Sequence, residues 1–296
     1  MIYDMTNSES TLNSLLELLN LNEEKKENVL DIILESDDAQ EFLEAFEIED
    51  AHLLEKKVEL VSLHSITSSD KCKSVKELGL INLQKAVSQD TPLKNYLSKK
   101  EIHINIEDKY IINKGNKLDI SEITDGFALS DDEEYRNRVI HKLYDDFQVN
   151  AFLYRRNVAS YEGETRNRPE ILLNLANFLK DDEIESDWVK DVNNVHYIIK
   201  FKQPLNYYKY WTYVVEYEDE FYGITKDSLE YLTFKEIEVK VKRWLIQKSI
   251  EILKNDIYEL FSYIRPEVIV EPKDIMEIMS EEEYFDKYKS EIEKEI

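Results

Sequence analysis

Apolar residues recur at helical spacing through the first part of the chain. Between residues 10 and 47, the positions that follow this spacing are Leu12, Leu15, Leu16, Leu19, Val29, Leu30, Ile32, Ile33, Phe42, Leu43 and Phe46. A period of about 3.6 residues is typical of amphipathic helices. Ser10, Asp37 and Asp38 are residue types that cap helix N-termini, and Asn20 and Ser36 fall where turns are needed. We therefore expect three short helices in residues 1–56.

After residue 57 the pattern changes to a mixture of strand and helix signals. Strand-like runs rich in β-branched or aromatic residues occupy 58–63, 102–106, 110–112, 149–154, 195–201, 211–217 and 267–270. Helical patterns occupy 70–78, which ends at Gly79, and then 83–87, 93–97, 131–147, 169–179, 234–257 and 280–296.

This order predicts an α+β fold with a mixed sheet at its core, because repeated strand-helix-strand units are few. We expect an acidic helical arm in residues 1–56, an α+β core domain in residues 57–278 and an acidic C-terminal helix or tail in residues 279–296.

The chain is strongly acidic, because it carries 63 Asp and Glu against 38 Lys and Arg, a net charge of -25. Such a balance excludes a protein that binds nucleic acid directly by neutralising phosphates. The acidity is concentrated at the two ends: residues 1–56 hold 16 acidic and 3 basic side chains, and residues 271–296 hold 10 and 4. The middle of the chain is nearly neutral by comparison.

The positions of glycine, cysteine and histidine exclude several kinds of binding site. The five glycines are isolated from one another, which excludes phosphate-binding loops and dinucleotide fingerprints. A single cysteine, Cys72, excludes an intramolecular disulfide, and no two histidines stand at metal-ligand spacing. From the glycine, cysteine and histidine positions we expect no metal and no cofactor. Since the sequence shows no basic and apolar leader and no long apolar run, we also expect a cytoplasmic protein with no membrane contact.

One stretch resembles a known fold. The run from Leu63 through His64 to Thr67, followed by a helix that ends in Leu78-Gly79-Leu80, is similar to the opening of the ADP-ribosyltransferase-like fold. Later segments follow in a compatible order over residues 58–278. The resemblance implies a cleft that binds NAD, with His64 on the ribose, Tyr161 on the nicotinamide and Glu267 (or Glu271) stabilising the developing oxocarbenium ion. Each of these three residues also has a purely structural interpretation, as a strand-end histidine, a loop tyrosine and the start of an edge strand.

The acidic arm suggests a different function. Carboxylates spaced along helices imitate phosphates and attract a basic DNA-binding surface over a long range. The candidate binding residues on the arm are Glu17, Glu23, Glu24, Asp37, Asp38, Glu41 and Glu44. The aromatic run that contains Tyr207, Tyr208 and Trp211 is a second candidate interface.

In size, acidity and composition, the chain resembles phage-encoded inhibitors of the bacterial Gabija defence system. This resemblance implies an oligomeric inhibitor in the host cytoplasm that binds a host defence complex and keeps it from DNA. Because no catalytic motif is present, we prefer this hypothesis. The alternative is a mono-ADP-ribosyltransferase that uses NAD with His64, Tyr161 and Glu267, and a third option is a toxin or antitoxin component without turnover.

Overall fold

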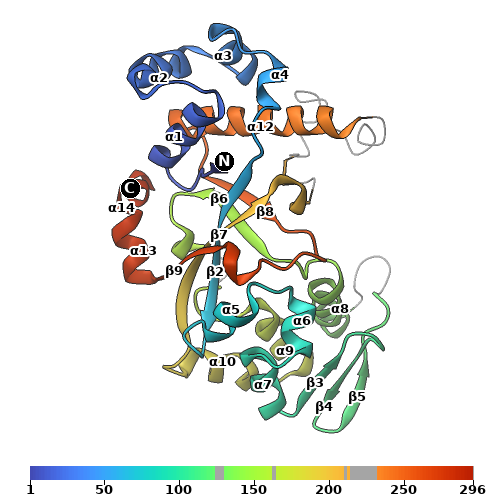
Figure 1. Ribbon diagram of the computed structural model, residues 1–296. Coiled ribbons are helices and arrows are strands. Elements are labelled where there is room, and N and C mark those ends of the chain that lie inside the picture. Colours follow the sequence, from blue (N-terminus) through green and yellow to red (C-terminus); the bar gives the residue numbers. More distant parts are fainter. Residues whose placement is uncertain (124–129, 162–164, 210–211, 214–231, 296) are drawn as a thin grey trace.

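The computed structural model describes residues 1–123, 130–161, 165–209, 212–213 and 232–295. These residues form a six-stranded sheet, a separate three-stranded sheet and helices around both, as Figure 1 shows. The predicted α+β class is therefore confirmed.

The six-stranded sheet has the order β8-β6-β2-β7-β9, with β1 paired to β2 beside this path. Its strands are β1 (Ile2–Tyr3), β2 (Glu59–Ser68), β6 (Asn150–Arg155), β7 (Val195–Pro204), β8 (Glu259–Tyr263) and β9 (Ile275–Ser280). The β1-β2 pair is parallel and the remaining pairs are antiparallel, so the sheet is mixed, as predicted.

The central strand β2 is paired unequally on its two edges. Strand β7 pairs with every residue of β2 along one edge. On the other edge, β1 pairs with Glu59 and Leu60, and β6 pairs only at Leu63. Within the described ranges, no named strand continues this second edge past Leu63. The part of β2 from Ser65 to Ser68 therefore has an open edge.

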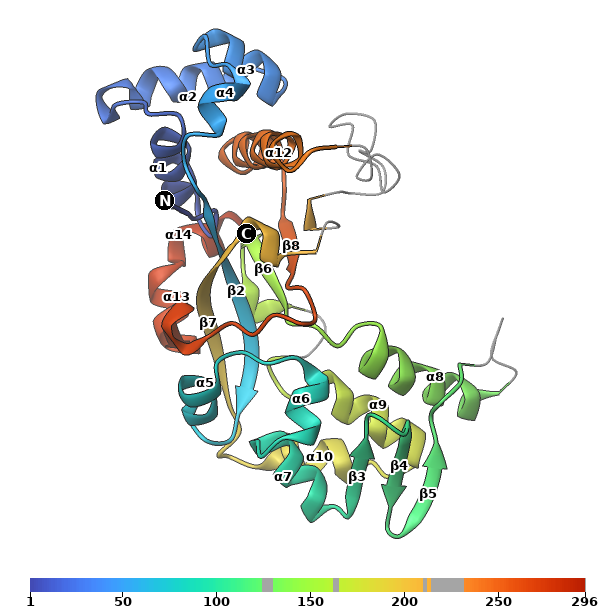
Figure 2. The same ribbon diagram turned by 45° about the vertical axis from the view of Figure 1, so that its right-hand side comes forward.

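Helices of the N-terminal arm pack on one long helix, α12 (Phe234–Lys254), as Figures 1 and 2 show. The arm contains α1 (Ser8–Leu18), the short turn η1 (Glu23–Lys25), α2 (Lys26–Glu35), α3 (Ala39–Ala45) and α4 (Asp50–Leu53). Leu15, Phe42 and Trp244 belong to the same buried cluster as strand residues of the main sheet. The arm thus shares the main hydrophobic core.

Cations of α12 hold the ends of the arm helices. The buried ammonium of Lys242 donates to the carbonyls of Leu53 at 2.7 Å and Lys56 at 2.6 Å, and Lys254 donates to the carbonyl of Ser36. These carbonyls lie at or just beyond the C-termini of α4 and α2, where backbone acceptors have no partner within the helix. The contacts fix the orientation of the arm on α12.

The middle of the chain builds a second lobe with its own hydrophobic cluster. Its elements are α6 (Leu83–Ser88), α7 (Pro92–Lys99), β3 (Ile102–Asn105), β4 (Tyr110–Asn113), β5 (Asn116–Asp119), α8 (Asp131–Tyr144), α9 (Glu170–Leu179) and α10 (Glu183–Lys190). Ile111, Leu143, Leu172 and Trp188 lie at the centre of this cluster. The expected core domain of residues 57–278 therefore contains two hydrophobic centres.

The C-terminal segment covers one face of the main sheet. The expected helix at residues 280–296 is divided into α13 (Glu281–Lys287), α14 (Lys289–Ile292) and the turn η7 (Glu293–Glu295). Tyr284 and Tyr288 pack with Leu63, Phe152 and Ile198 of the sheet.

Some predicted strands differ from the structure. Residues 267–270 form no strand, and only Val270 makes an isolated bridge, to Leu80. The predicted strand at 211–217 lies almost entirely outside the described residues. Helix α5 (Lys73–Leu78), in contrast, ends at Gly79 as expected. The remaining short turns are η2 (Val158–Ser160), η3 (Leu205–Tyr207) and η6 (Pro272–Asp274).

Candidate functional site

A cleft of about 610 Å³ lies beside the open edge of β2. Its walls come from residues 64–68 of β2, the segment from α5 to α7, the start of β6 and the residues that lead into α9. Pockets of this size and partly apolar lining are where small ligands bind most often. Successive side chains of a strand point to opposite faces. Because both His64 and Ser65 line the cleft, it reaches both faces of the sheet.

His64 lies in this cleft in one definite tautomer. Its Nδ1 is 2.7 Å from the carbonyl oxygen of Asn150. Since a carbonyl only accepts, Nδ1 carries the proton and Nε2 of the neutral ring has a free lone pair. Burial lowers the pKa of His64, the hydrogen bond to Asn150 opposes that shift, and Lys142 adds to it, with a lowered pKa as the net result. His64 is thus a neutral acceptor near pH 7.

Tyr161 lines the same cleft on the other face of the sheet. Its ring lies edge-on to Phe152, with ring centres 5.2 Å apart, and Phe152 is paired with Leu63 in the register of β6 and β2. The guanidinium of Arg155 lies 5.3 Å from the centre of the Tyr161 ring. The structure therefore brings His64 and Tyr161 to one cleft, from opposite faces.

Glu267 is not part of this cleft. Its side chain is 59% exposed and forms an ion pair with Arg265 at 2.6 Å, in the segment that was expected to be a strand. Glu271 likewise pairs with Lys273 at 2.6 Å and does not line the cleft. The carboxylates that do line it are Asp146 and Glu170.

Cations in the cleft wall are held by carboxylates. Lys142 lies 2.6 Å from both Asp146 and Glu170, and the buried Arg168 is paired with Glu185. Burial lowers the pKa of Lys142, but the two carboxylates raise it by more. These pairs leave the wall with little net positive charge.

A polar chain that the sequence analysis did not identify begins at Ser65. The Oγ of Ser65 is 2.9 Å from Nε2 of His196, and Nδ1 of His196 is 3.0 Å from Oε2 of Glu281. Thr165 Oγ1 lies 3.2 Å from the same Ser65 Oγ. Ser65, His196 and Glu281 lie far apart in the sequence, on β2, β7 and α13, so only the strand register could have revealed their proximity.

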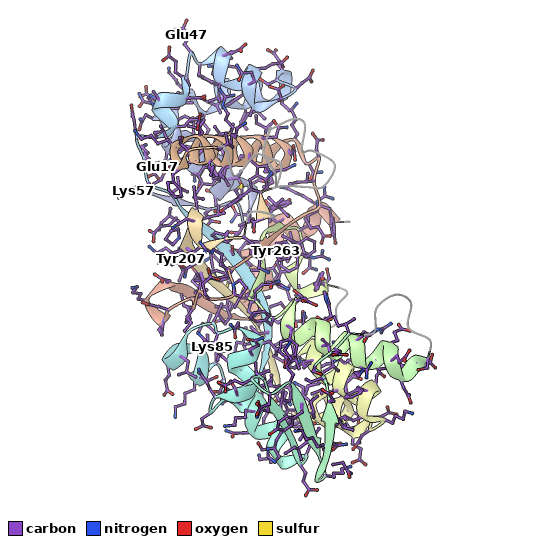
Figure 3. All side chains as sticks on the ribbon, turned by 90° about the vertical axis from the view of Figure 1, so that its right-hand side faces the viewer. Glu17, Glu47, Lys57, Lys85, Tyr207 and Tyr263 are labelled. Atoms are coloured by element: carbon purple, nitrogen blue, oxygen red, sulfur yellow. The ribbon has the colours of Figure 1, made fainter. Side chains whose placement is uncertain are left out.

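Most of the predicted acidic residues lie at the surface of the arm. Glu17, Glu24, Asp37, Glu41 and Glu44 are exposed, and Figure 3 shows Glu17 and Glu47 on the part of the molecule formed by the arm. Asp38 has a structural role, because its Oδ1 accepts from the backbone N–H of Glu41 at 2.9 Å and caps α3. The side chain of Glu23 lies outside the described part of the structure.

The predicted aromatic surface is not formed as a unit. Tyr207 is 40% exposed and is labelled in Figure 3. Tyr208 is a core residue, since it is buried and its hydroxyl donates to the carbonyl of Leu60 at 2.8 Å. Burial also raises the pKa of Tyr208. Trp211 lies outside the described residues, so Tyr207 alone of the three is placed at the surface.

Across the ranges given above, no group of three or more His, Cys, Asp or Glu side chains is arranged to hold a metal ion. In the same ranges, none of the helices combines the length and apolar character needed to span a bilayer. No family model, no curated protein and no solved structure matches this chain.

Proposed function

We propose that this protein is a stoichiometric inhibitor of phage or prophage type that binds a DNA-processing defence complex of the host. The exposed carboxylates of the arm occupy the basic surface on which a Gabija-like nuclease would bind DNA. This proposal is carried by one observation: the exposed carboxylates Glu17, Glu24, Asp37, Glu41 and Glu44 lie on helices and connecting turns of an arm that packs on α12.

The charge balance of the arm supports this function. Residues 1–56 contain only three cations, Lys25, Lys26 and Lys56, against 16 carboxylates. Most of these carboxylates therefore have no cation of the arm with which to pair. A surface of one charge on a fixed scaffold attracts an oppositely charged surface and accelerates association at low salt. Because the helices are already ordered, little conformational entropy is lost on binding.

The direct test is inhibition of DNA cleavage by a purified Gabija-type nuclease complex. We expect cleavage to stop at a fixed molar ratio of this protein, and a rise in salt to weaken the inhibition. Changing Glu17, Glu24 and Glu44 together to Gln should weaken inhibition about tenfold, since charges at the rim of an interface act mainly on the association rate.

A matched control changes the same number of charges on the other lobe. Glu101, Glu107 and Glu122 are exposed there, and their joint replacement by Gln should leave inhibition unaltered. If both triple variants inhibit equally, the arm is not the binding surface. If the unchanged protein does not inhibit at any ratio, the proposed function is wrong.

A second candidate function is mono-ADP-ribosyl transfer, with NAD as the substrate. The observation that favours it is the position of His64 and Tyr161 in one cleft. His64 would accept a hydrogen bond from a ribose hydroxyl through Nε2. In place of Glu267, the cleft offers Asp146 and Glu170 as carboxylates near the sugar. The pyrophosphate fits less well, because Lys142 and Arg168 are already paired with carboxylates.

Calorimetric titration with NAD tests this candidate. We expect heat of binding that is lost in His64→Ala. Absence of binding at millimolar NAD excludes the transferase, and it leaves the inhibitor proposal unaffected because the arm lies elsewhere on the molecule.

A further inference from the structure

The hydrogen bonds of His196 define its tautomer. An ionised carboxylate only accepts hydrogen bonds, so the contact with Glu281 places the ring proton on Nδ1. The other nitrogen, Nε2, then carries a lone pair directed at the hydroxyl of Ser65. This is the arrangement in which a histidine removes the proton of a serine nucleophile.

The surroundings of His196 keep it neutral and fixed in position. Its ring is buried, and burial lowers its pKa. Glu281 raises that pKa, and Arg166, which pairs with the other oxygen of Glu281, lowers it. The net effect is a lowered pKa, so the ring is available as a base near pH 7. Glu281 begins α13, where the helix dipole also favours its negative charge.

Ser65 is the member of this group that faces the cleft. Its position on β2 follows Leu63 by two residues, so it leaves the sheet on the same face as Phe152, near Tyr161 and Phe261. That face of the cleft is apolar and aromatic. Since the nearby cations are paired with carboxylates, the cleft suits an uncharged ligand with an apolar portion.

We propose that Ser65, His196 and Glu281 form a catalytic centre that hydrolyses carboxylic esters of apolar acyl groups. This activity is independent of the inhibition proposed above, because it uses the cleft and not the arm. Ser65 and His196 are catalytic residues, and Glu281 is a positioning residue that acts through His196.

The reaction proceeds in two balanced steps. Ser65 Oγ attacks the ester carbonyl carbon while its proton passes to Nε2 of His196. The bond from the carbonyl carbon to the alkoxy oxygen then breaks, and the alcohol leaves with the proton from His196. In the second step, water attacks the acyl-serine, gives its proton to His196 and releases the carboxylic acid. The proton returns from His196 to Ser65. The hydroxyl of Thr165, whose Oγ1 lies 3.2 Å from Ser65 Oγ, would donate a hydrogen bond to the oxyanion of both steps.

The test uses the full chain with a fluorophosphonate probe and with p-nitrophenyl butyrate. We expect the probe to modify Ser65, as identified by peptide mass spectrometry. Ser65→Ala should lower ester hydrolysis at least about a hundredfold. Ser88→Ala is the matched control, because Ser88 is exposed on α6 and bonds only to its own helix; it should retain the unchanged rate.

The variant Glu281→Gln tests whether Glu281 positions His196 or only stabilises the fold. It should reduce the rate and move the midpoint of the pH-rate profile to lower pH, because the carboxylate that raises the pKa of His196 is gone. A purely structural Glu281 would change the melting temperature and leave this midpoint in place, which would remove it from the proposed centre. If the folded, unchanged protein shows no modification at Ser65, or if Ser65→Ala hydrolyses the ester at the full rate, the proposed centre does not exist.

Discussion

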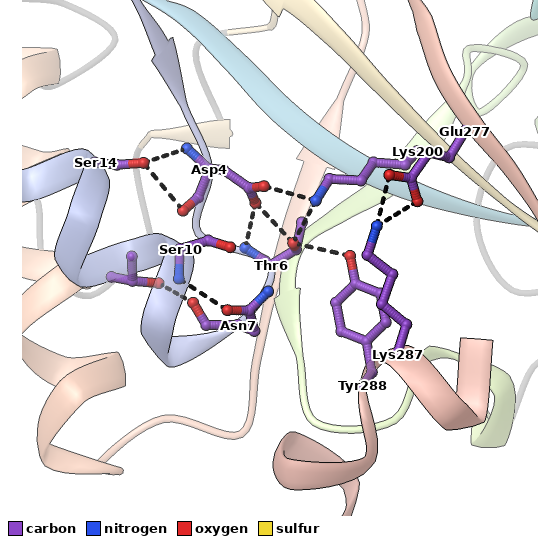
Figure 4. Close-up of polar contacts among 10 residues, drawn as sticks. Asp4, Thr6, Asn7, Ser10, Ser14, Lys200, Glu277, Lys287 and Tyr288 are labelled. Carbon is purple, nitrogen blue, oxygen red and sulfur yellow. Dashed lines mark hydrogen bonds and ion pairs between the residues drawn. The ribbon is translucent and has the colours of Figure 1, made fainter. Parts of the chain in front are cut away.

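The ammonium of Lys200 lies 2.6 Å from Oδ2 of Asp4, inside the molecule, as Figure 4 shows. Lys200 is on β7, and Asp4 follows β1 at the start of the chain. Thr6 connects this pair to the C-terminal segment, since its Oγ1 lies 3.3 Å from Lys200 Nζ and 3.1 Å from the hydroxyl of Tyr288. Burial lowers the pKa of Lys200, but Asp4 and Tyr288 raise it by more. One buried cation thus joins both ends of the chain to the sheet.

Replacing Lys200 by Met should lower the free energy of unfolding by about 2–4 kcal/mol, because Asp4 is left as a largely buried charge without a partner. Urea denaturation measures this loss. Lys287→Met is the control, since its pair with Glu277 in Figure 4 is roughly 40% exposed on both sides and should contribute under about 1 kcal/mol. Adding Asp4→Asn to Lys200→Met should recover part of the stability; equal losses in the two single Lys variants would contradict this prediction.

We expect the stabilising contribution of Glu291 to be lost in acid, when its carboxylate becomes protonated. Burial raises the pKa of this carboxyl, but the N–H of Ser8 and the ammonium of Lys294 lower it by more. Ser8 N lies 2.8 Å and Lys294 Nζ 2.9 Å from its oxygens. Because the folded-state pKa lies below the ordinary value of about 4.3, the stabilisation is complete above that pH and is lost as the pH falls through the folded-state pKa.

Glu291→Gln should therefore cost about 1–3 kcal/mol at pH 6 and progressively less toward pH 3. Urea denaturation of both proteins at several pH values measures the difference. A difference that stays constant over this pH range would show that Glu291 contributes by packing and not by its charge.

Position 79 requires glycine for two reasons, its backbone conformation and its close approach to Val270. It has φ 78° and ψ -165°, a region that residues with a side chain almost never occupy. A Cβ at this position would lie 2.0 Å from the carbonyl oxygen of Val270. Gly79→Ala should therefore destabilise the protein by about 2–4 kcal/mol.

Gly115 provides the comparison for this prediction. It also has a positive φ, 83°, but no atom lies within 4 Å of a Cβ placed there. Gly115→Ala should cost only about 1 kcal/mol. Thermal melting of the two variants measures both effects, and similar melting temperatures would mean that the segment around Val270 shifts to make room.

Lys242 should stabilise the arm through its backbone contacts. Lys242→Met leaves the carbonyls of Leu53 and Lys56 without this donor, at a cost of about 2–4 kcal/mol. Lys235→Met, at an exposed position in the first turn of the same helix, should change stability by less than about 0.5 kcal/mol. Hydrogen exchange should show faster exchange in α4 for the Lys242 variant; unchanged protection there would mean that the apolar contacts alone hold the arm.

Strongly periodic segments were predictable from the sequence. The expected helix at 234–257 corresponds to α12, and the expected strand at 195–201 corresponds to the first part of β7. Both are long and carry clear apolar patterns, and α12 has a capping box in Thr233 and Glu236. Strands β8 and β9 were not predicted, because their residues do not alternate clearly between apolar and polar and each strand gains its stability from its neighbour in the sheet.

The site was predictable only in part, for a similar reason. The local sequence around His64 and Gly79 indicated one wall of the cleft, and Tyr161 was expected near it. Glu267 was chosen by its order in the chain, and nothing local to it reports its distance from His64. The contact between Ser65 and His196 depends on the register of β2 and β7, which pairs Thr67 with His196. A single sequence does not specify such pairings. The function itself stays a proposal.

The contacts between the two ends of the chain impose an order on folding. The hydrogen bonds from Thr6 to Tyr288 and from Ser8 to Glu291 join residues 282 and 283 positions apart. During synthesis on a ribosome, these bonds form only after Tyr288 and Glu291 have emerged. The second lobe, whose buried residues all fall between Val87 and Trp188, has no such requirement. Because closing long loops is slow, we expect that lobe to fold first and the six-stranded sheet to be completed last.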